Sequence, residues 1–77
     1  MENKLFLFRI EYHHYRTGEP TSAKIGIIKA RDKETAKELI WQDFGDDYAT
    51  LKDYDISDVT NMNYATIEVH YPKSNNF

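Results

Sequence analysis

The chain has 77 residues, of which 40% are hydrophobic and 30% are charged, and its formal net charge is −3. This length suffices for one small domain with a limited hydrophobic core, and the lack of cysteine excludes disulfides, zinc-thiolate sites and thiol nucleophiles. No apolar run approaches the roughly 20 residues of a membrane span, and the run at residues 5–8 is shorter than the apolar core of a signal peptide. We therefore expect a cytoplasmic protein without a membrane partner.

The first part of the chain predicts a β-hairpin. Residues 4–16 alternate between apolar and polar side chains, which is typical of a strand. The first half of this segment is apolar on both faces, which suits an interior position in a sheet. Residues 17–20 include a glycine and a proline and predict a turn. A second strand is expected at residues 22–30, where Gly26 indicates a bulge or a close contact.

A helix is expected after the hairpin. Asp32 is a good N-cap residue, and Gly45 is well placed to end the helix. Trp41 lies off the centre of the apolar stripe, so it either covers the margin of the core, which we favour, or stays partly exposed as a binding anchor. The stripe itself has helical spacing and consists of Ala36, Leu39, Ile40 and Phe44.

The second half of the chain predicts two more strands. Residues 46–52 are expected to form a loop with one helical turn, and residues 53–59 a third strand. Residues 64–71 alternate strictly and predict a fourth strand, which Pro72 ends. Residues 73–77 are polar for the most part and are expected to be frayed.

The order ββαββ predicts one small α+β domain over residues 1–77. We expect a two-layer sandwich with a four-stranded, mainly antiparallel sheet and one helix on one face. A β-grasp-like order, 2-1-4-3, would place the doubly apolar first strand inside the sheet, and the simple order 1-2-3-4 is the alternative. The expected core consists of Phe6, Phe8, Ile10, Ile25, Ile27, Ala36, Leu39, Ile40, Phe44, Ile56, Ile67 and Val69.

The histidines do not form a convincing metal site. His13 and His14 are neighbours on a strand and point to opposite faces. His13 could meet His70 across neighbouring strands, but two imidazoles are too few ligands for a secure site. The sequence also lacks a G-x-S-x-G serine, a glycine-rich phosphate loop and a calcium-loop pattern. We expect no metal, no cofactor and no enzymatic activity.

Acidic residues are concentrated in the segment 43–58, where Lys52 is the one basic residue. One interpretation is an acidic surface that binds a basic partner, with faster association at low salt. The other is a solvated loop whose aspartates cap turns, and the sequence leaves both open. The candidate binding residues are Asp46, Asp47, Asp53 and Asp55, together with Trp41.

The functional hypothesis is a non-enzymatic interaction domain. It would be a protein-binding adaptor or an inhibitor of the kind that phages and mobile elements encode, and its partner would have a basic surface. A nucleic-acid-binding module is the first alternative, with the first hairpin supplying Arg9, Tyr12, Tyr15 and Arg16, although the chain is acidic overall. A homodimer or larger homo-oligomer formed through exposed sheet edges is the second alternative.

Overall fold

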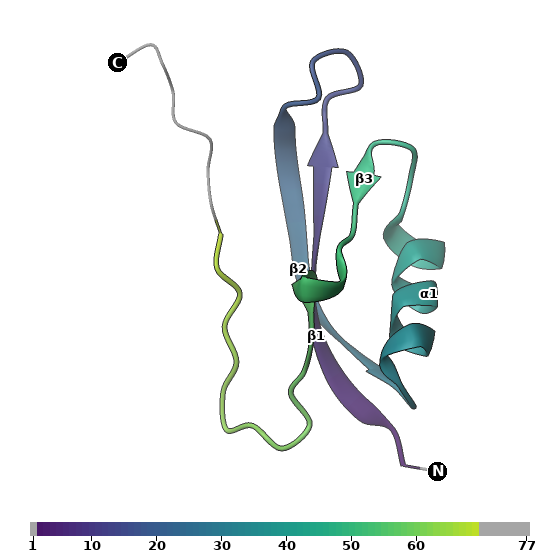
Figure 1. Cartoon of the computed structure of the whole chain (residues 1–77), viewed down its shortest axis with the longest axis vertical. Coiled ribbons are helices and arrows are strands. Elements are labelled where there is room, and N and C mark those ends of the chain that lie inside the picture. The colour runs from purple at the N-terminus through teal and green to yellow at the C-terminus, as the bar shows by residue number, and fades with distance from the viewer. Residues whose placement is uncertain (1, 70–77) are drawn as a thin grey trace.

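A computed structural model describes residues 2–69 (Figure 1). It contains a four-stranded antiparallel sheet with one helix, which confirms the predicted α+β fold. The elements in chain order are β1 (Lys4–His13), β2 (Pro20–Ala30), α1 (Lys33–Phe44), β3 (Ala49–Thr50), the short 3₁₀ helix η1 (Asp53–Asp55) and β4 (Ile56–Asp58). Figure 1 shows α1 on one side of the sheet and the last part of the described chain on the other.

Strand β1 lies inside the sheet, as its doubly apolar sequence predicts. β2 pairs along one side of it, from Lys4 opposite Ala30 to Tyr12 opposite Ser22. β3 and β4 both pair with the other side of β1. This arrangement is neither of the two expected strand orders, because both late strands pair with β1.

The third strand is shorter than predicted and is interrupted. Phe8 of β1 pairs with Ile56 of β4, and Glu11 of β1 pairs with Thr50 of β3. The segment from Thr50 to Ile56 is longer than the stretch of β1 that it faces. The surplus residues are looped out as η1, which occupies the first half of the expected strand 53–59. The expected helical turn at residues 48–51 is instead partly the strand β3.

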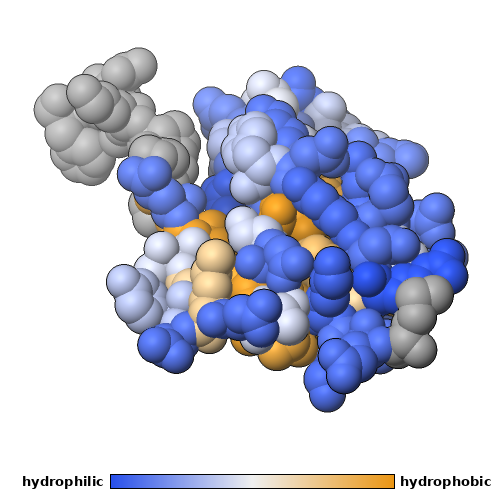
Figure 2. Space-filling model, turned by 60° about the horizontal axis from the view of Figure 1, so that its bottom comes forward, coloured by the Kyte–Doolittle hydropathy of each residue, from blue (hydrophilic) through white to orange (hydrophobic). Residues whose placement is uncertain are grey.

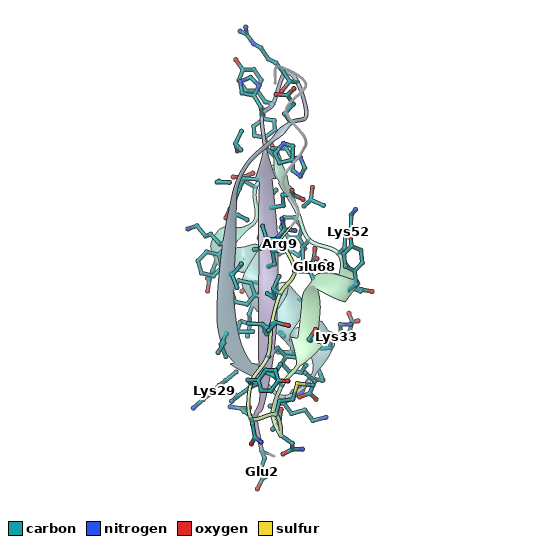
Figure 3. The ribbon with its side chains drawn as sticks, turned by 90° about the vertical axis from the view of Figure 1, so that its left-hand side faces the viewer. Glu2, Arg9, Lys29, Lys33, Lys52 and Glu68 are labelled. Carbon is teal, nitrogen blue, oxygen red and sulfur yellow. The ribbon has the colours of Figure 1, made fainter. Side chains whose placement is uncertain are left out.

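The predicted fourth strand is wrong over residues 64–69, which pair with no strand of the described chain. In Figure 3 this segment passes in front of the sheet, on the face opposite α1. β3 and β4 already occupy the second side of β1, so this segment has no partner there. Residues 70 and 71 of the predicted strand, and the expected frayed end at 73–77, lie outside the described residues.

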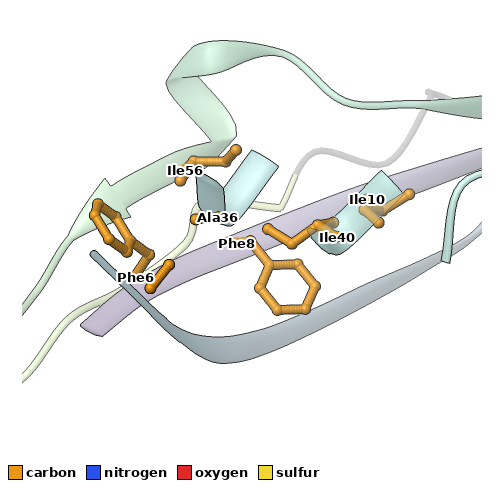
Figure 4. Packing of buried hydrophobic residues seen from close by; sticks show 7 residues of the cluster. Phe6, Phe8, Ile10, Ala36, Ile40 and Ile56 are labelled. Atoms are coloured by element: carbon orange, nitrogen blue, oxygen red, sulfur yellow. The ribbon is translucent and has the colours of Figure 1, made fainter. Parts of the chain in front are cut away.

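The core lies between β1 and α1 and includes Ile56 from β4 (Figure 4). Ile10 and Ile40 are fully buried. Partial burial is found for Phe44, Ile67 and Val69, which were expected in the core. The expected core residues that are buried are Phe6, Phe8, Ile10, Ala36, Ile40 and Ile56.

Three expected core residues are exposed instead. Ile25 and Ile27 are 52% and 64% exposed, because they pair with Arg9 and Leu7 and therefore point away from α1. The Cβ of Gly26, between them, would face Phe8 on the helix side. Leu39 is 36% exposed, at the margin of the helix stripe.

The ends of α1 follow the sequence signals. The Asp32 side chain accepts a hydrogen bond from the Thr35 N–H at 2.8 Å, as expected of an N-cap. At the other end the Gly45 N–H donates to the Trp41 carbonyl at 3.0 Å. Gly45 has φ −76°, so its backbone is not left-handed. In residues 2–69, no helix is long and apolar enough to cross a membrane.

Candidate functional site

Three aspartates lie close together in the sequence at the C-terminal end of α1. Asp43 lies in the last turn, and Asp46 and Asp47 follow directly after the cap residue Gly45. The last turn contains no basic residue. Because the C-terminal end of a helix carries partial negative charge, this arrangement concentrates negative potential at one end of the molecule.

The loop after the helix is ordered by its own hydrogen bonds. A carboxylate oxygen of Asp46 accepts from the Tyr48 N–H at 2.7 Å, and its carbonyl accepts from the Ala49 N–H at 3.2 Å. The Tyr48 carbonyl accepts from the His13 N–H at 2.8 Å, which attaches the loop to the end of β1. Tyr48 remains 51% exposed. The loop therefore presents an aromatic side chain beside the acidic helix end.

The helix end is also attached to β1. The Tyr12 hydroxyl donates to the Phe44 carbonyl at 2.7 Å, and this carbonyl has no partner within the helix. Trp41 is half-buried, with its ring against the Gly45 backbone. The site is therefore held by the helix, the loop and the sheet together.

The remaining two candidate aspartates lie elsewhere. Asp53 accepts a hydrogen bond from the Lys37 ammonium at 2.7 Å, and this contact lowers the pKa of Asp53 and raises that of Lys37. Asp55 lines a hollow of about 390 Å³ together with Arg9 and Glu11, whose side chains are on the sheet face opposite α1. The structure thus separates Asp53 and Asp55 from the acidic helix end.

The hollow beside Asp55 contains charges of both signs. The Arg9 guanidinium lies 3.6 Å from Glu11, and Thr66, Ile67 and Glu68 line the hollow from the last part of the described chain. Figure 3 shows Arg9 and Glu68 on this side of the sheet. Because Arg9 is the one basic residue in this lining and Glu11, Asp55 and Glu68 are acidic, the hollow does not favour an anion.

The histidines have local partners. His13 is within 3.0 Å of the Gly18 carbonyl, and His14 accepts from the Arg16 N–H at 3.1 Å and stacks on Tyr15 at 5.0 Å. Within residues 2–69, His, Cys, Asp and Glu side chains form no group that could hold a metal ion. His70 lies outside the described residues.

The residues considered for nucleic-acid binding do not gather on one open surface. Tyr12 is half-buried and bonded to the helix end, whereas Arg9 lies on the opposite sheet face. The Tyr15 ring is in contact with its own neighbours, because it stacks with His14 and Arg16 lies 5.2 Å from its centre.

Sequence reasoning did not anticipate a groove along β2. It has a volume of about 500 Å³ and is lined mainly by apolar residues on the helix face of the sheet. The signal was Gly26, which was expected to mark a bulge or a close contact, and which lies against the Phe8 ring. The lining residues include Phe8, Gly26, Ile28 and Phe44, together with Lys24 and Asp43.

No protein-family model, curated protein or solved structure matches the chain.

Proposed function

We propose that the protein is a non-enzymatic protein-binding domain, an adaptor or inhibitor, and that the acidic C-terminal end of α1 binds a basic segment of its partner. The observation that carries this proposal is the position of Asp43, Asp46 and Asp47 at the negative end of the helix dipole. None of the three forms an ion pair with a lysine or arginine within residues 2–69. A cation from a partner would relieve this concentration of charge.

The three carboxylates differ in what they do for the fold. Asp46 orders the loop by accepting from the Tyr48 N–H, so a purely structural role explains it. No hydrogen bond holds the side chain of Asp43 or Asp47 within the described residues, so a structural role does not explain these two. Turn formation therefore accounts for Asp46 but not for Asp43 and Asp47, which are exposed.

The neighbouring aromatics suit a protein partner. Tyr48 is half exposed and Trp41 is half-buried, and these two residue types are frequent among the residues that dominate binding energies. The negative helix end would speed the encounter with a basic partner, and salt would weaken that effect. We place this activity in the cytoplasm, since the chain has no cysteine and thus no bond that an oxidising compartment would stabilise.

The test is a titration of the isotope-labelled protein with a short synthetic peptide in which arginine alternates with serine, followed by NMR. We expect shift changes to concentrate on the amides of residues 41–49 and to weaken in high salt. The double variant Asp43→Asn, Asp47→Asn should bind about fivefold more weakly, since surface ion pairs are individually weak.

A matched control removes the same charge elsewhere. Glu2 and Glu38 are exposed, and the double variant Glu2→Gln, Glu38→Gln should bind the peptide nearly as well as the wild type. If both double variants lose the same affinity, or if the shift changes spread evenly over the surface, the helix end is not a binding site.

A further inference from the structure

Strand β2 forms an edge of the sheet. Within residues 2–69 it pairs only with β1, whose other side is taken by β3 and β4. The outward backbone groups of β2 are therefore unpaired in the described part of the chain. An edge strand with free N–H and C=O groups can take up a further strand.

Both faces of this edge are apolar near its centre. Ile25 and Ile27 are exposed on the face opposite α1. Figure 2 shows that apolar residues reach the surface of the molecule among hydrophilic ones. On the helix face lies the groove beside Gly26. A β-carbon at Gly26 would come within 2.9 Å of Phe8 Cζ, so the Phe8 ring packs against Gly26 and lines the groove there.

Lysines on edge strands usually prevent the addition of a further strand. Lys24 does so poorly here, because its ammonium lies 5.1 Å from the centre of the Phe44 ring. The charge of Lys24 therefore lies over the end of α1. Lys29 lies further along β2, beyond the two exposed isoleucines.

We propose that a second copy of this chain binds here, with the two β2 strands antiparallel about a two-fold axis and Gly26 opposite Gly26. In this register Ile25 of one copy lies opposite Ile27 of the other, twice. Lys24 lies opposite Ile28, and Lys29 opposite Ala23, so no lysines face each other.

Neighbouring two-fold registers are less favourable. A register centred on Ile27 keeps one pair of exposed isoleucines, Ile27 with Ile27, in place of two, and one centred on Lys24 places two lysines opposite each other. A register centred on Ile25 places Ile27 opposite Ala23 and so loses one apolar pair. The Gly26 register is therefore the one that matches apolar side chains and separates the charges.

The size of this contact indicates a weak dimer. Residues 22–30 would pair over a length of about 30 Å. With one layer of side chains on each face, the contact buries on the order of 1,000 Å² in total, at the lower limit of specific interfaces. The contact occupies the β2 edge of both copies, so this mode of association stops at two copies.

Sedimentation equilibrium of the full chain tests the proposal. The wild-type mass should rise from 9.1 kDa toward twice this value as the concentration increases. One double variant carries Ile25→Lys and Ile27→Lys, and a second carries Ile25→Glu and Ile27→Glu. Each variant alone should remain monomeric, because like charges face each other in the proposed register. An equimolar mixture of the two should form dimers, because opposite charges then meet.

Both isoleucines are exposed, and circular dichroism of each variant checks that the fold is retained. A wild type that stays monomeric at millimolar concentration overturns the proposal. The occupant of the β2 edge would then be a different protein. Dimers of either charged variant alone, or a mixture that stays monomeric, also overturn it. Asp43 belongs to the acidic helix end and also lines the groove beside β2, but the two tests change different residues and measure different binding events, so the failure of one leaves the other standing.

Discussion

The indole ring of Trp41 lies directly against the backbone of Gly45, at the end of α1. A β-carbon at position 45 would overlap this ring, while φ −76° would suit any residue. Packing, and not backbone conformation, therefore requires the glycine. The substitution Gly45→Ala should displace Trp41 and lower the free energy of unfolding by about 1–3 kcal/mol. Denaturant unfolding and a red shift of tryptophan emission would show both effects.

Gly18 is the matched control. It has φ +71°, and a β-carbon there would meet no heavy atom within 4 Å. The substitution Gly18→Ala should cost about 1 kcal/mol through the left-handed backbone alone, with unchanged tryptophan emission. If Gly45→Ala also leaves the emission unchanged, the Trp41 ring does not lie against Gly45 in solution.

Two neighbouring residues of α1 should respond very differently to truncation. Ile40 is fully buried, whereas Leu39 is 36% exposed. Truncation of a buried large side chain costs about 2–5 kcal/mol, so Ile40→Ala should severely destabilise this small domain. Leu39→Ala should cost less than about 1 kcal/mol. Thermal unfolding of both variants checks the assignment, and equal losses would contradict the orientation of the helix.

The hairpin and the helix could be predicted because their signals are local. Alternation defined the first strand, and the turn residues and the apolar segment after them indicated the second. The cap at Asp32 and the glycine at position 45 defined the helix. Ile25 and Ile27 could not be assigned correctly, because alternation shows which residues share a face but not which face α1 covers. Residues 64–69 show the same limit, since a strand-like pattern does not reveal that the nearest edge is already occupied.

The candidate site could be predicted only in part. Asp46 and Asp47 were recognised from the density of charge, and the structure places them at the helix end with Asp43. The separation of Asp53 and Asp55 was not visible in the sequence, because it depends on how η1 is looped out between β3 and β4. The edge formed by β2 is part of one of the two expected strand orders, 2-1-4-3, but the sequence does not decide between them.

The hydrogen bond from the Tyr12 hydroxyl to the Phe44 carbonyl joins β1 to the end of α1. The substitution Tyr12→Phe keeps the ring and removes the donor, so it should cost about 1 kcal/mol. Hydrogen exchange should become faster at the Gly45 amide, because the last turn loses its attachment to the sheet. Unchanged exchange at this amide would mean that the helix end does not depend on Tyr12.

The Lys37–Asp53 ion pair predicts a specific pH dependence of stability. The hydrogen bond with Lys37 lowers the pKa of Asp53, so the stabilisation from this carboxylate is present above the ordinary aspartate pKa. It is lost as the pH falls through the lowered value. The same contact raises the pKa of Lys37. Its stabilisation is present below the ordinary lysine pKa and is lost as the pH rises through the raised value.

The difference in unfolding temperature between the wild type and Lys37→Gln measures the pair. It should be small, largest near neutral pH and low salt, and should disappear in strong acid, in strong base and in high salt, because both groups are exposed. Lys29→Gln is the matched control: it removes the charge of an exposed lysine that forms no ion pair within residues 2–69, so it should change the unfolding temperature little at any pH. A Lys37→Gln difference that persists unchanged in strong acid would show that Asp53 is not the partner of Lys37.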